Sequence, residues 1–403
     1  MTALARLARS RRALAVAVAA AVLVAAALLG QRASLRWLLL AVAALGGLVL
    51  LRQPAVGLLG LVAAALVVPL EFGTGTEVRL NTATLLVPAL GALWLLDRMR
   101  RRDLRIARSR VNLPLGLFLL AGLLSLGLGN VLWDPAVPRP PRFLLVQLAQ
   151  WAVFAFAALA FWLAGNGIES TLWLRRLAWA FLLLGGGLAV LYALPPLERL
   201  ASRLATLALV RAPFWVLLAA LAGGLLLFDR SLGRWRRVWL VLVLGAVLHY
   251  AFIRQREAAS NWVGVTAVLG VLLWLRFRRL RWPILILLVT LTAIGILFPT
   301  VYEFAGGEQE WAGSGAPRLV LIERVIEVTL HNPVTGLGPA AYRPYTRMEP
   351  LAYRGALWID PLVSAHNNYV DLFAHTGLVG LGLFLWFMVE LQLDHEPQEQ
   401  PQS

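Results

Sequence analysis

The sequence has no cysteine and no lysine among its 403 residues. The absence of cysteine excludes disulfides, thiolate metal sites and cysteine nucleophiles. Arginine therefore carries all the positive charge, and no glycine-rich phosphate loop with a lysine occurs, which argues against an ATP-driven enzyme. Charged residues of every kind are scarce, at 14% of the chain, well below the share found in soluble domains.

Long apolar segments, in contrast, are abundant in the sequence. Hydrophobic residues form 60% of the chain, and the mean hydropathy is +0.74. Runs of about 17 to 22 apolar residues recur from end to end, and such runs are long enough to cross a bilayer. The sequence therefore predicts an all-α, polytopic membrane protein with about 12 transmembrane helices. The predicted spans are 13–30, 35–51, 54–70, 80–96, 113–129, 143–164, 176–194, 212–228, 237–253, 261–276, 282–299 and 372–391.

The net charge of +16 fits a membrane topology better than nucleic-acid binding. Cationic residues collect in the cytoplasmic loops of membrane proteins. If the N-terminus is cytoplasmic, the arginine-rich loops all fall inside: 97–110, 174–176, 229–237 and 277–282. The outer loops 71–79 and 130–142 are poorer in arginine. One outer segment, 195–211, is moderately basic and predicts a short helix on the membrane surface. Its apolar side would consist of Leu197, Leu200, Leu204 and Leu207.

This topology divides the chain into four parts. Residues 1–299 form a transmembrane bundle of about 11 spans, and residues 300–371 form one large extracytoplasmic loop before the last span, 372–391. The polar end, 392–403, is predicted to be a disordered cytoplasmic tail.

The large loop carries the polar motifs. The segment PRLVLIERVIEVTL predicts a helix over 317–330, with Pro317 in its first turn and Leu319, Ile322, Ile326 and Leu330 on one apolar face. The Pro- and Gly-containing HNPVTGLGPAAYRPY at 331–345 then ends the helix. SAHNNY, 364–369, follows at the outer water interface, on the same predicted side as RQREAAS at 254–260.

The order of these motifs resembles the O-antigen ligase and polymerase superfamily, the lipid-linked glycan transferases of bacterial envelopes. The family pattern pairs an arginine-bearing outer helix ending in a Pro-Leu-x-Gly-x-Gly turn with a later Ser-x-His-Asn segment. Here the two parts read RLVLIERVIEVTLHNPVTGLG and SAHNNYVDLFAHTGLVG. RQREAASNWVG stands for a further arginine segment, without the usual serine before its arginine. His375 stands where the family often has glutamate.

The resemblance implies transfer of a glycan from a polyprenyl-diphosphate carrier to a hydroxyl of a glycan, lipid or protein acceptor. It also implies that the protein lies in the bacterial cytoplasmic membrane. Arginine gives permanently charged, bidentate contacts to phosphate oxygens, so Arg318, Arg256 and Arg254 are candidates for binding the diphosphate. His366 is the candidate catalytic base for the acceptor hydroxyl. Asn367 and Tyr369 are candidates for binding sugar. The outer loops show no paired-carboxylate cluster beyond GGEQE, so we expect a glycosyltransferase without metal or other cofactor.

Each candidate residue also has a purely structural interpretation. His366 and Asn367 suit a helix cap, and the arginines suit anchors at the headgroup level. A membrane transporter or flippase is the competing class. Such a protein should carry charges near the middle of its spans or an internal repeat, and most of the predicted spans have no such charge and the sequence shows no convincing repeat. Within the enzyme class, the sequence leaves ligase and polymerase open.

Overall fold

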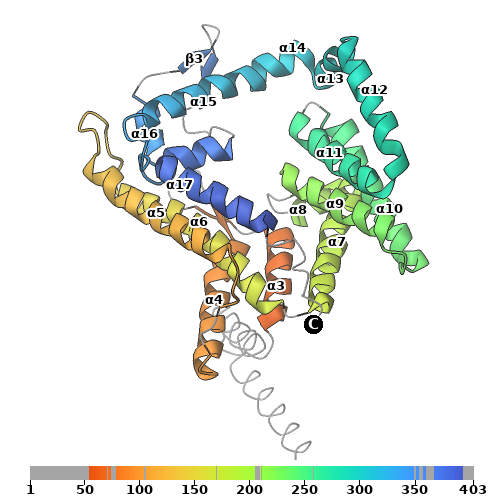
Figure 1. Cartoon of the computed structure of the whole chain (residues 1–403), viewed down its shortest axis with the longest axis horizontal. Coiled ribbons are helices and arrows are strands. Elements are labelled where there is room, and N and C mark those ends of the chain that lie inside the picture. Colours follow the sequence, from red (N-terminus) through yellow and green to blue (C-terminus); the bar gives the residue numbers. More distant parts are fainter. Residues whose placement is uncertain are drawn as a thin grey trace, which may run out of the picture. The chain divides into compact units, whose positions relative to one another are not determined.

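The computed structural model describes residues 54–69, 71–73, 79–103, 106–168, 170–204, 209, 211–256, 258–348, 351–353, 357–359 and 367–393 (Figure 1). The chain divides into two units, residues 1–56 and 57–403, and nearly all described residues belong to the second. The predicted spans 13–30 and 35–51 and most of the predicted tail lie outside the described residues.

The described elements are nearly all helices. The exceptions are two short antiparallel hairpins, β1 with β2 and β3 with β4, which the all-α prediction did not include. The elements in chain order are α3 (Pro54–Val67), β1 (Glu71–Gly73), β2 (Arg79–Asn81), α4 (Thr82–Arg100), α5 (Asn112–Val131), α6 (Phe143–Gly167), α7 (Thr171–Ala193), η1 (Pro195–Leu197), α8 (Glu198–Leu204), α9 (Ala212–Phe228), α10 (Arg234–His249), η3 (Tyr250–Arg254), α11 (Ala259–Arg276), η4 (Arg278–Leu280), α12 (Arg281–Ala293), α13 (Leu297–Phe304), α14 (Gly307–Glu310), η5 (Trp311–Gly315), α15 (Ala316–Thr329), α16 (Tyr342–Thr346), β3 (Leu351–Tyr353), β4 (Leu357–Ile359) and α17 (Asn368–Leu393).

Within the described residues, six helices are long and apolar enough to cross a membrane: Thr82–Arg100, Asn112–Val131, Phe143–Gly167, Thr171–Ala193, Arg234–Arg254 and Asn368–Leu393. A seventh candidate span is formed if the pair Ser260–Arg276 and Arg278–Ala293 is counted as one. The prediction of an all-α, multi-pass membrane protein is therefore confirmed, whereas 12 spans are not shown.

Four of the predicted spans differ from the structure in length or in shape. Helices α3 and α9 have only 14 and 17 residues, and at about 1.5 Å per residue both are shorter than a hydrocarbon core of about 30 Å. Helices α11 and α12 were predicted as two spans joined by an arginine-rich loop. They form a pair bent by 114° at η4, where Arg278 and Arg279 interrupt the apolar sequence.

One hydrophobic core, the first core, joins α7, α9, α10 and α11. Its centre contains fully buried side chains from all four helices: Leu182, Trp215, Val243 and Val265. The Trp215 ring stacks on Tyr250 with the ring centroids 3.7 Å apart. These helices are apolar on several faces, as expected for segments that contact both protein and lipid.

A second core joins the segment after α5 with α15, α16 and α17. It contains Trp133, Val137, Phe143, Leu321, Val325, Val328, Leu337, Ala341, Tyr342, Tyr345 and Ala374. The Asp134 amide donates a 2.9 Å hydrogen bond to the Tyr345 hydroxyl. Helices α5 and α15 also pack on α17 (Figure 1). The loop 130–142 is thereby fixed to the segment 316–345.

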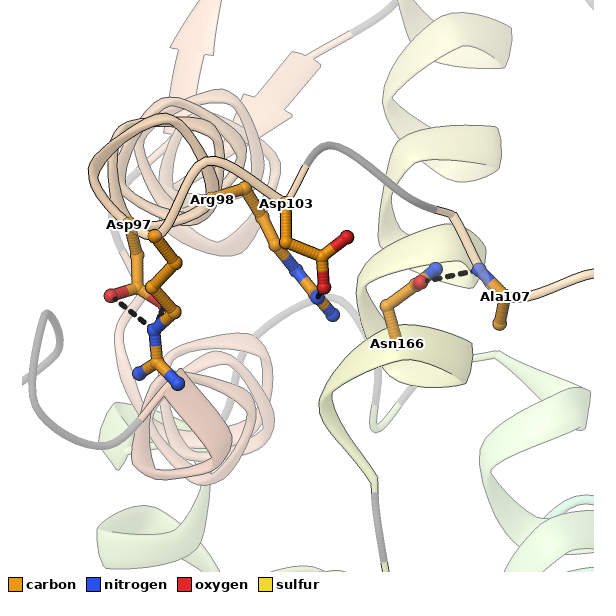
Figure 2. Close-up of polar contacts among 6 residues, drawn as sticks. Asp97, Arg98, Asp103, Ala107 and Asn166 are labelled. Carbon is orange, nitrogen blue, oxygen red and sulfur yellow. Dashed lines mark hydrogen bonds and ion pairs between the residues drawn. The ribbon is translucent and has the colours of Figure 1, made fainter.

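Loops assigned to one side of the membrane contact other loops of the same side. On the predicted inner side, Arg175 pairs with Asp229 at 3.2 Å, and the Ala107 amide donates to Asn166 Oδ1 at 2.8 Å (Figure 2). On the predicted outer side, loop 130–142 packs on 321–345, and Glu198 pairs with Arg254 at 2.8 Å. The contacts agree with the predicted grouping of loops, while the direction of insertion stays a prediction.

At the end of α4 and in the loop that follows it, arginine and aspartate side chains form ion pairs with one another. Arg101 pairs with Asp97 at 2.9 Å and Arg98 with Asp103 at 3.2 Å (Figure 2). The carboxylates therefore offset part of the positive charge that the positive-inside rule places in this loop.

The predicted surface helix within 195–211 is seen as η1 and α8. Leu197 and Leu200 are exposed, whereas Ala201 is completely buried. This arrangement leaves an apolar edge available to a membrane surface.

Candidate functional site

Only the second half of the segment SAHNNY, residues 367–369, is among the described residues. His366, the predicted base, lies outside the described residues, as do Ser364 and Ala365. Asn367 comes directly before α17 and caps it: its Oδ1 accepts hydrogen bonds from the amides of Tyr369 at 3.0 Å and Val370 at 3.3 Å. The capping interpretation of Asn367 is therefore confirmed, and its role toward sugar remains a prediction.

Tyr369 lies in the first turn of α17 with about half of its surface exposed, at 52%. Its ring meets Phe384 edge-on, with centroids 6.3 Å apart. About half of the residue's surface is therefore open to a ligand.

Helix α17 is broken near its first third. Gly377 has φ 65° and ψ −166°, so the helix from Asn368 ends there and a second helical segment continues to Leu393. This backbone region is essentially restricted to glycine. The break removes two helical hydrogen bonds, those from the amides of Leu378 and Val379 to the carbonyls four residues earlier.

Each of the four freed backbone groups has a new partner. The amides of Leu378 and Val379 donate to the carbonyls of Pro333 at 2.9 Å and Val334 at 3.1 Å. The carbonyl of Ala374 accepts from the Leu337 amide at 3.0 Å. The carbonyl of His375 accepts from Ser125 Oγ at 2.7 Å. A break inside a candidate span is tolerated because neighbouring chain satisfies the backbone in this way.

The turn that fills the break is the NPVTGLG segment after α15. Gly336 and Gly338 have φ of 76° and 103°, and a Cβ on Gly336 would lie 2.5 Å from the Gly377 nitrogen. A Cβ on Gly377 would in turn overlap the Val334 carbonyl oxygen. The glycines of both motifs are therefore required by the close crossing of two backbones.

Helix α5 packs against the turn at 333–338 where that turn crosses α17. Gly129 lies so near the Leu337 carbonyl that any Cβ would overlap it. Gln147 of α6 is completely buried, and its Oε1 accepts from Asn130 Nδ2 at 2.7 Å. Gln147 Nε2 lies 3.2 Å from the Cβ position of Gly338. Ser125, Gly129 and Gln147 were not singled out in the sequence, because nothing in their apolar surroundings marks them.

His375 lies at the end of the first segment of α17 and is 97% buried, at 3% exposed. Its ring centroid is 5.4 Å from Tyr342 and 6.0 Å from Phe154. Nδ1 has no hydrogen-bond partner among the described residues. The side chain thus belongs to the packing at the break in α17.

Helix α15 begins at the predicted place, with Pro317 in its first turn, and the apolar face predicted from the spacing is mostly exposed in the structure. Leu319, Ile326 and Leu330 are exposed, and the buried residues are Leu321, Arg324, Val325, Val328 and Thr329. Apolar residues of α15 occur on several of its faces, so their spacing in the sequence does not identify the face that packs. The packed face contains two polar residues, and both have partners within α15: Arg324 pairs with Glu327 at 2.7 Å, and Thr329 Oγ1 donates to the Val325 carbonyl.

Arg318 lies on the exposed surface in the first turn of α15. Within the described part of the chain, no ion pair involves Arg318, and no contact joins it to Arg254 or Arg256. The structure therefore connects Arg318 to the start of α17 through the turn at 333–338, and it does not connect the three predicted arginines to one another.

Arg254 and Arg256 differ sharply in their surroundings. Arg254 makes a bidentate pair with Glu198, with Nη1 and Nη2 each 2.8 Å from a carboxylate oxygen. Its guanidinium also lies over the Tyr192 ring, 5.3 Å from the centroid. Arg256 is exposed, and its backbone carbonyl accepts a 2.8 Å hydrogen bond from Trp262 Nε1. The fork of Arg254 is already occupied, whereas a ligand can reach that of Arg256.

The pair with Arg254 also affects Glu198. The hydrogen bond from Arg254 holds the pKa of the Glu198 carboxyl below its ordinary value, and the charge attraction acts in the same direction. Glu198 is therefore ionised at neutral pH, and it anchors α8 to the segment before Arg256.

Comparison with known proteins supports the motifs. The sequence profile described as O-antigen ligase matches residues 256–385. No curated protein and no solved structure matches the chain. The matched segment begins at Arg256 and contains α15, the turn at 333–338, and most of α17, which are the elements that the structure brings together. Residues 256–385 of this chain therefore carry the O-antigen ligase family domain.

Proposed function

We infer from the family domain that this protein performs glycan transfer of the ligase or polymerase type from a lipid-linked donor. We propose that this protein is the ligase: it transfers a glycan from polyprenyl diphosphate to an acceptor hydroxyl at the outer face of the cytoplasmic membrane. The observation that carries the proposal is the interlock between the two family motifs. The turn after α15 fills the break in α17 and so fixes the first segment of α17, which starts next to His366.

In this proposal, His366 takes the proton from the acceptor hydroxyl. The acceptor oxygen then attacks the anomeric carbon of the donor glycan, and the bond from that carbon to the lipid diphosphate breaks. Imidazole suits this role because its ordinary pKa lies near neutrality. The Asn367 side-chain oxygen already caps α17, so its amide nitrogen is the group proposed to contact sugar, and Tyr369 stacks on a sugar ring.

We assign the diphosphate to Arg318 and Arg256. Both are exposed, and arginine forks match phosphate oxygens in geometry and charge. Arg254 is the weaker candidate, because binding phosphate would require it to leave Glu198. With two guanidinium groups to neutralise the leaving group, the proposed mechanism needs no metal.

The test is glycan transfer in membranes at matched protein levels. His366→Ala should lower the rate about 10²- to 10⁴-fold, as loss of a general base does. His395→Ala removes the same side chain from the C-terminal tail and should leave transfer unchanged. Near wild-type transfer by His366→Ala would show that SAHNNY is only a helix cap.

Two further measurements address the arginines and the metal. Arg318→Ala and Arg256→Ala should abolish transfer, lysine replacements should restore only part of it, and Arg203→Ala on exposed α8 should have no effect. Transfer should survive EDTA, and strict dependence on an added divalent ion would contradict a metal-free site.

The product distinguishes ligase from polymerase. A single transfer of glycan to a separate lipid or protein acceptor supports the ligase. Lengthening of the glycan on the polyprenyl carrier, with no such acceptor required, would assign the protein to the polymerases.

A further inference from the structure

A shallow cavity with a volume of about 460 Å³ lies at the start of α10, outside the O-antigen ligase family domain. Its lining consists of Leu232, Arg234, Arg237, Val238, Val241 and Leu242. Residues 234, 237, 238, 241 and 242 recur at the spacing of one helix face. The cavity is therefore a stripe along α10, with two arginines at one end and an apolar surface along the rest.

The apolar part of the stripe is open. Val238, Val241 and Leu242 are 46%, 56% and 52% exposed. α10 belongs to the candidate span Arg234–Arg254, so the two arginines stand at the end of a membrane-crossing helix and the apolar residues stand deeper. From residue 234 to 242 the helix rises about 12 Å, which is a substantial part of one hydrocarbon leaflet.

The charge at the end of the stripe is not balanced by nearby carboxylates. The first turn of α10 has no acidic residue. Asp229, the nearest carboxylate in sequence, pairs with Arg175 at 3.2 Å and lies near Arg236. No acidic side chain pairs with Arg234 or Arg237 among the described residues. Residues 1–53 contain no Asp or Glu, so that segment has no carboxylate with which to neutralise them.

We propose that this stripe binds an anionic phospholipid. Arg234 and Arg237 hold the lipid phosphate, and an acyl chain lies along Val238, Val241 and Leu242. Charge complementarity selects the headgroup, because guanidinium groups bind phosphate oxygens and interfacial arginines favour anionic lipid surfaces. The apolar residues select a lipid over free phosphate, since only a lipid covers them.

The test uses full-length protein purified in detergent, with lipid retention measured by native mass spectrometry. Phosphatidylglycerol and phosphatidylcholine are added at equal mole fraction. Wild type should retain phosphatidylglycerol in preference to phosphatidylcholine. The double variant Arg234→Gln/Arg237→Gln should weaken retention of phosphatidylglycerol about 10- to 30-fold, as expected for two interfacial arginines.

Matched variants show which residues of the stripe bind the lipid. Arg278→Gln/Arg279→Gln removes the same charge from exposed η4 and should retain lipid like wild type. Leu242→Gln should weaken retention while leaving both arginines in place. Inorganic phosphate should not displace the lipid.

Several results would overturn the proposal. One is equal loss of lipid in the two double variants, and another is equal retention of the two lipids by wild type. A third concerns the acidic C-terminal tail as an alternative occupant. If Asp394→Asn/Glu396→Gln/Glu399→Gln gains phosphatidylglycerol that wild type lacks, the tail occupies the stripe and the lipid does not.

Discussion

Ser125 Oγ lies 2.7 Å from the carbonyl oxygen of His375, although 250 residues separate them in the sequence. The bond exists because Gly377 breaks α17 and frees that carbonyl. The turn after α15 satisfies the other three freed groups. A helix outside the family domain thus completes the backbone of the segment that begins next to His366.

Replacing Ser125 by alanine should destabilise the protein. The His375 carbonyl would be left buried without its donor, at a cost of about 1–3 kcal/mol. Glycan transfer should fall because the first segment of α17 loses one of its attachments. Thermal unfolding in detergent, together with transfer in membranes, measures both effects.

Ser202→Ala is the control for this measurement. Ser202 Oγ also donates to a carbonyl, that of Glu198 at 2.9 Å, but the bond is exposed. Water replaces such a donor, so little change is expected. Equal unfolding temperatures for the Ser125 and Ser202 variants would show that the buried bond contributes nothing.

Gly377→Ala should be far more damaging than Gly382→Ala in the same helix. Alanine at 377 must adopt a backbone conformation that costs on the order of 1–3 kcal/mol, and its Cβ would overlap the Val334 carbonyl oxygen. A Cβ at Gly382 meets nothing within 4 Å. The fraction of monodisperse protein after extraction compares the two, and an intact Gly377→Ala protein would mean that the crossing is not rigid.

Arg254 and Arg256 should separate into a structural and a functional residue. Arg254→Gln removes the bidentate partner of Glu198 and should lower the unfolding temperature. Arg256→Gln removes an exposed side chain and should leave that temperature unchanged while transfer is lost. Unfolding and transfer measured on the same preparations decide the assignment. The reverse pattern would exchange the two roles.

The contribution of the Glu198–Arg254 pair should depend on pH. The folded pKa of Glu198 is below its ordinary value of 4.5, so the folded state binds the proton more weakly than the unfolded chain. The stabilisation is therefore complete above pH 4.5 and is lost as the pH falls through the lower, folded pKa. The difference in unfolding temperature between wild type and Arg254→Gln should stay constant from about pH 6 to 8 and shrink below 4.5. A difference that grows on acidification would contradict this linkage.

The direction of insertion can be measured because the chain has no cysteine background. Single cysteines at Arg108 and Ala136, both exposed, lie in loops of opposite predicted sides. An impermeant thiol reagent should label Ala136→Cys in intact cells and Arg108→Cys only after the membrane is opened. Labelling of both positions in intact cells would contradict the proposed outer location of the site.

The apolar runs alone predicted the membrane class and the positions of most described helices. The apolar run at 212–228 matches α9 residue for residue. Hydropathy did not determine which helices are long and straight enough to cross. The bend of 114° between α11 and α12 and the short α9 depend on local backbone geometry, which hydropathy does not contain.

The motifs likewise identified the family domain and its polar residues without showing how they are joined. Sequence order placed Arg318, the Gly336–Gly338 turn and SAHNNY in one domain, because their residue types are distinctive. Only the tertiary structure decided that Arg324 packs inward while Leu319 faces out, that Arg254 is held by Glu198, and that Ser125 completes the break at Gly377. Each depends on a partner far away in the chain or on a helix face that apolar periodicity cannot specify when lipid covers the other faces.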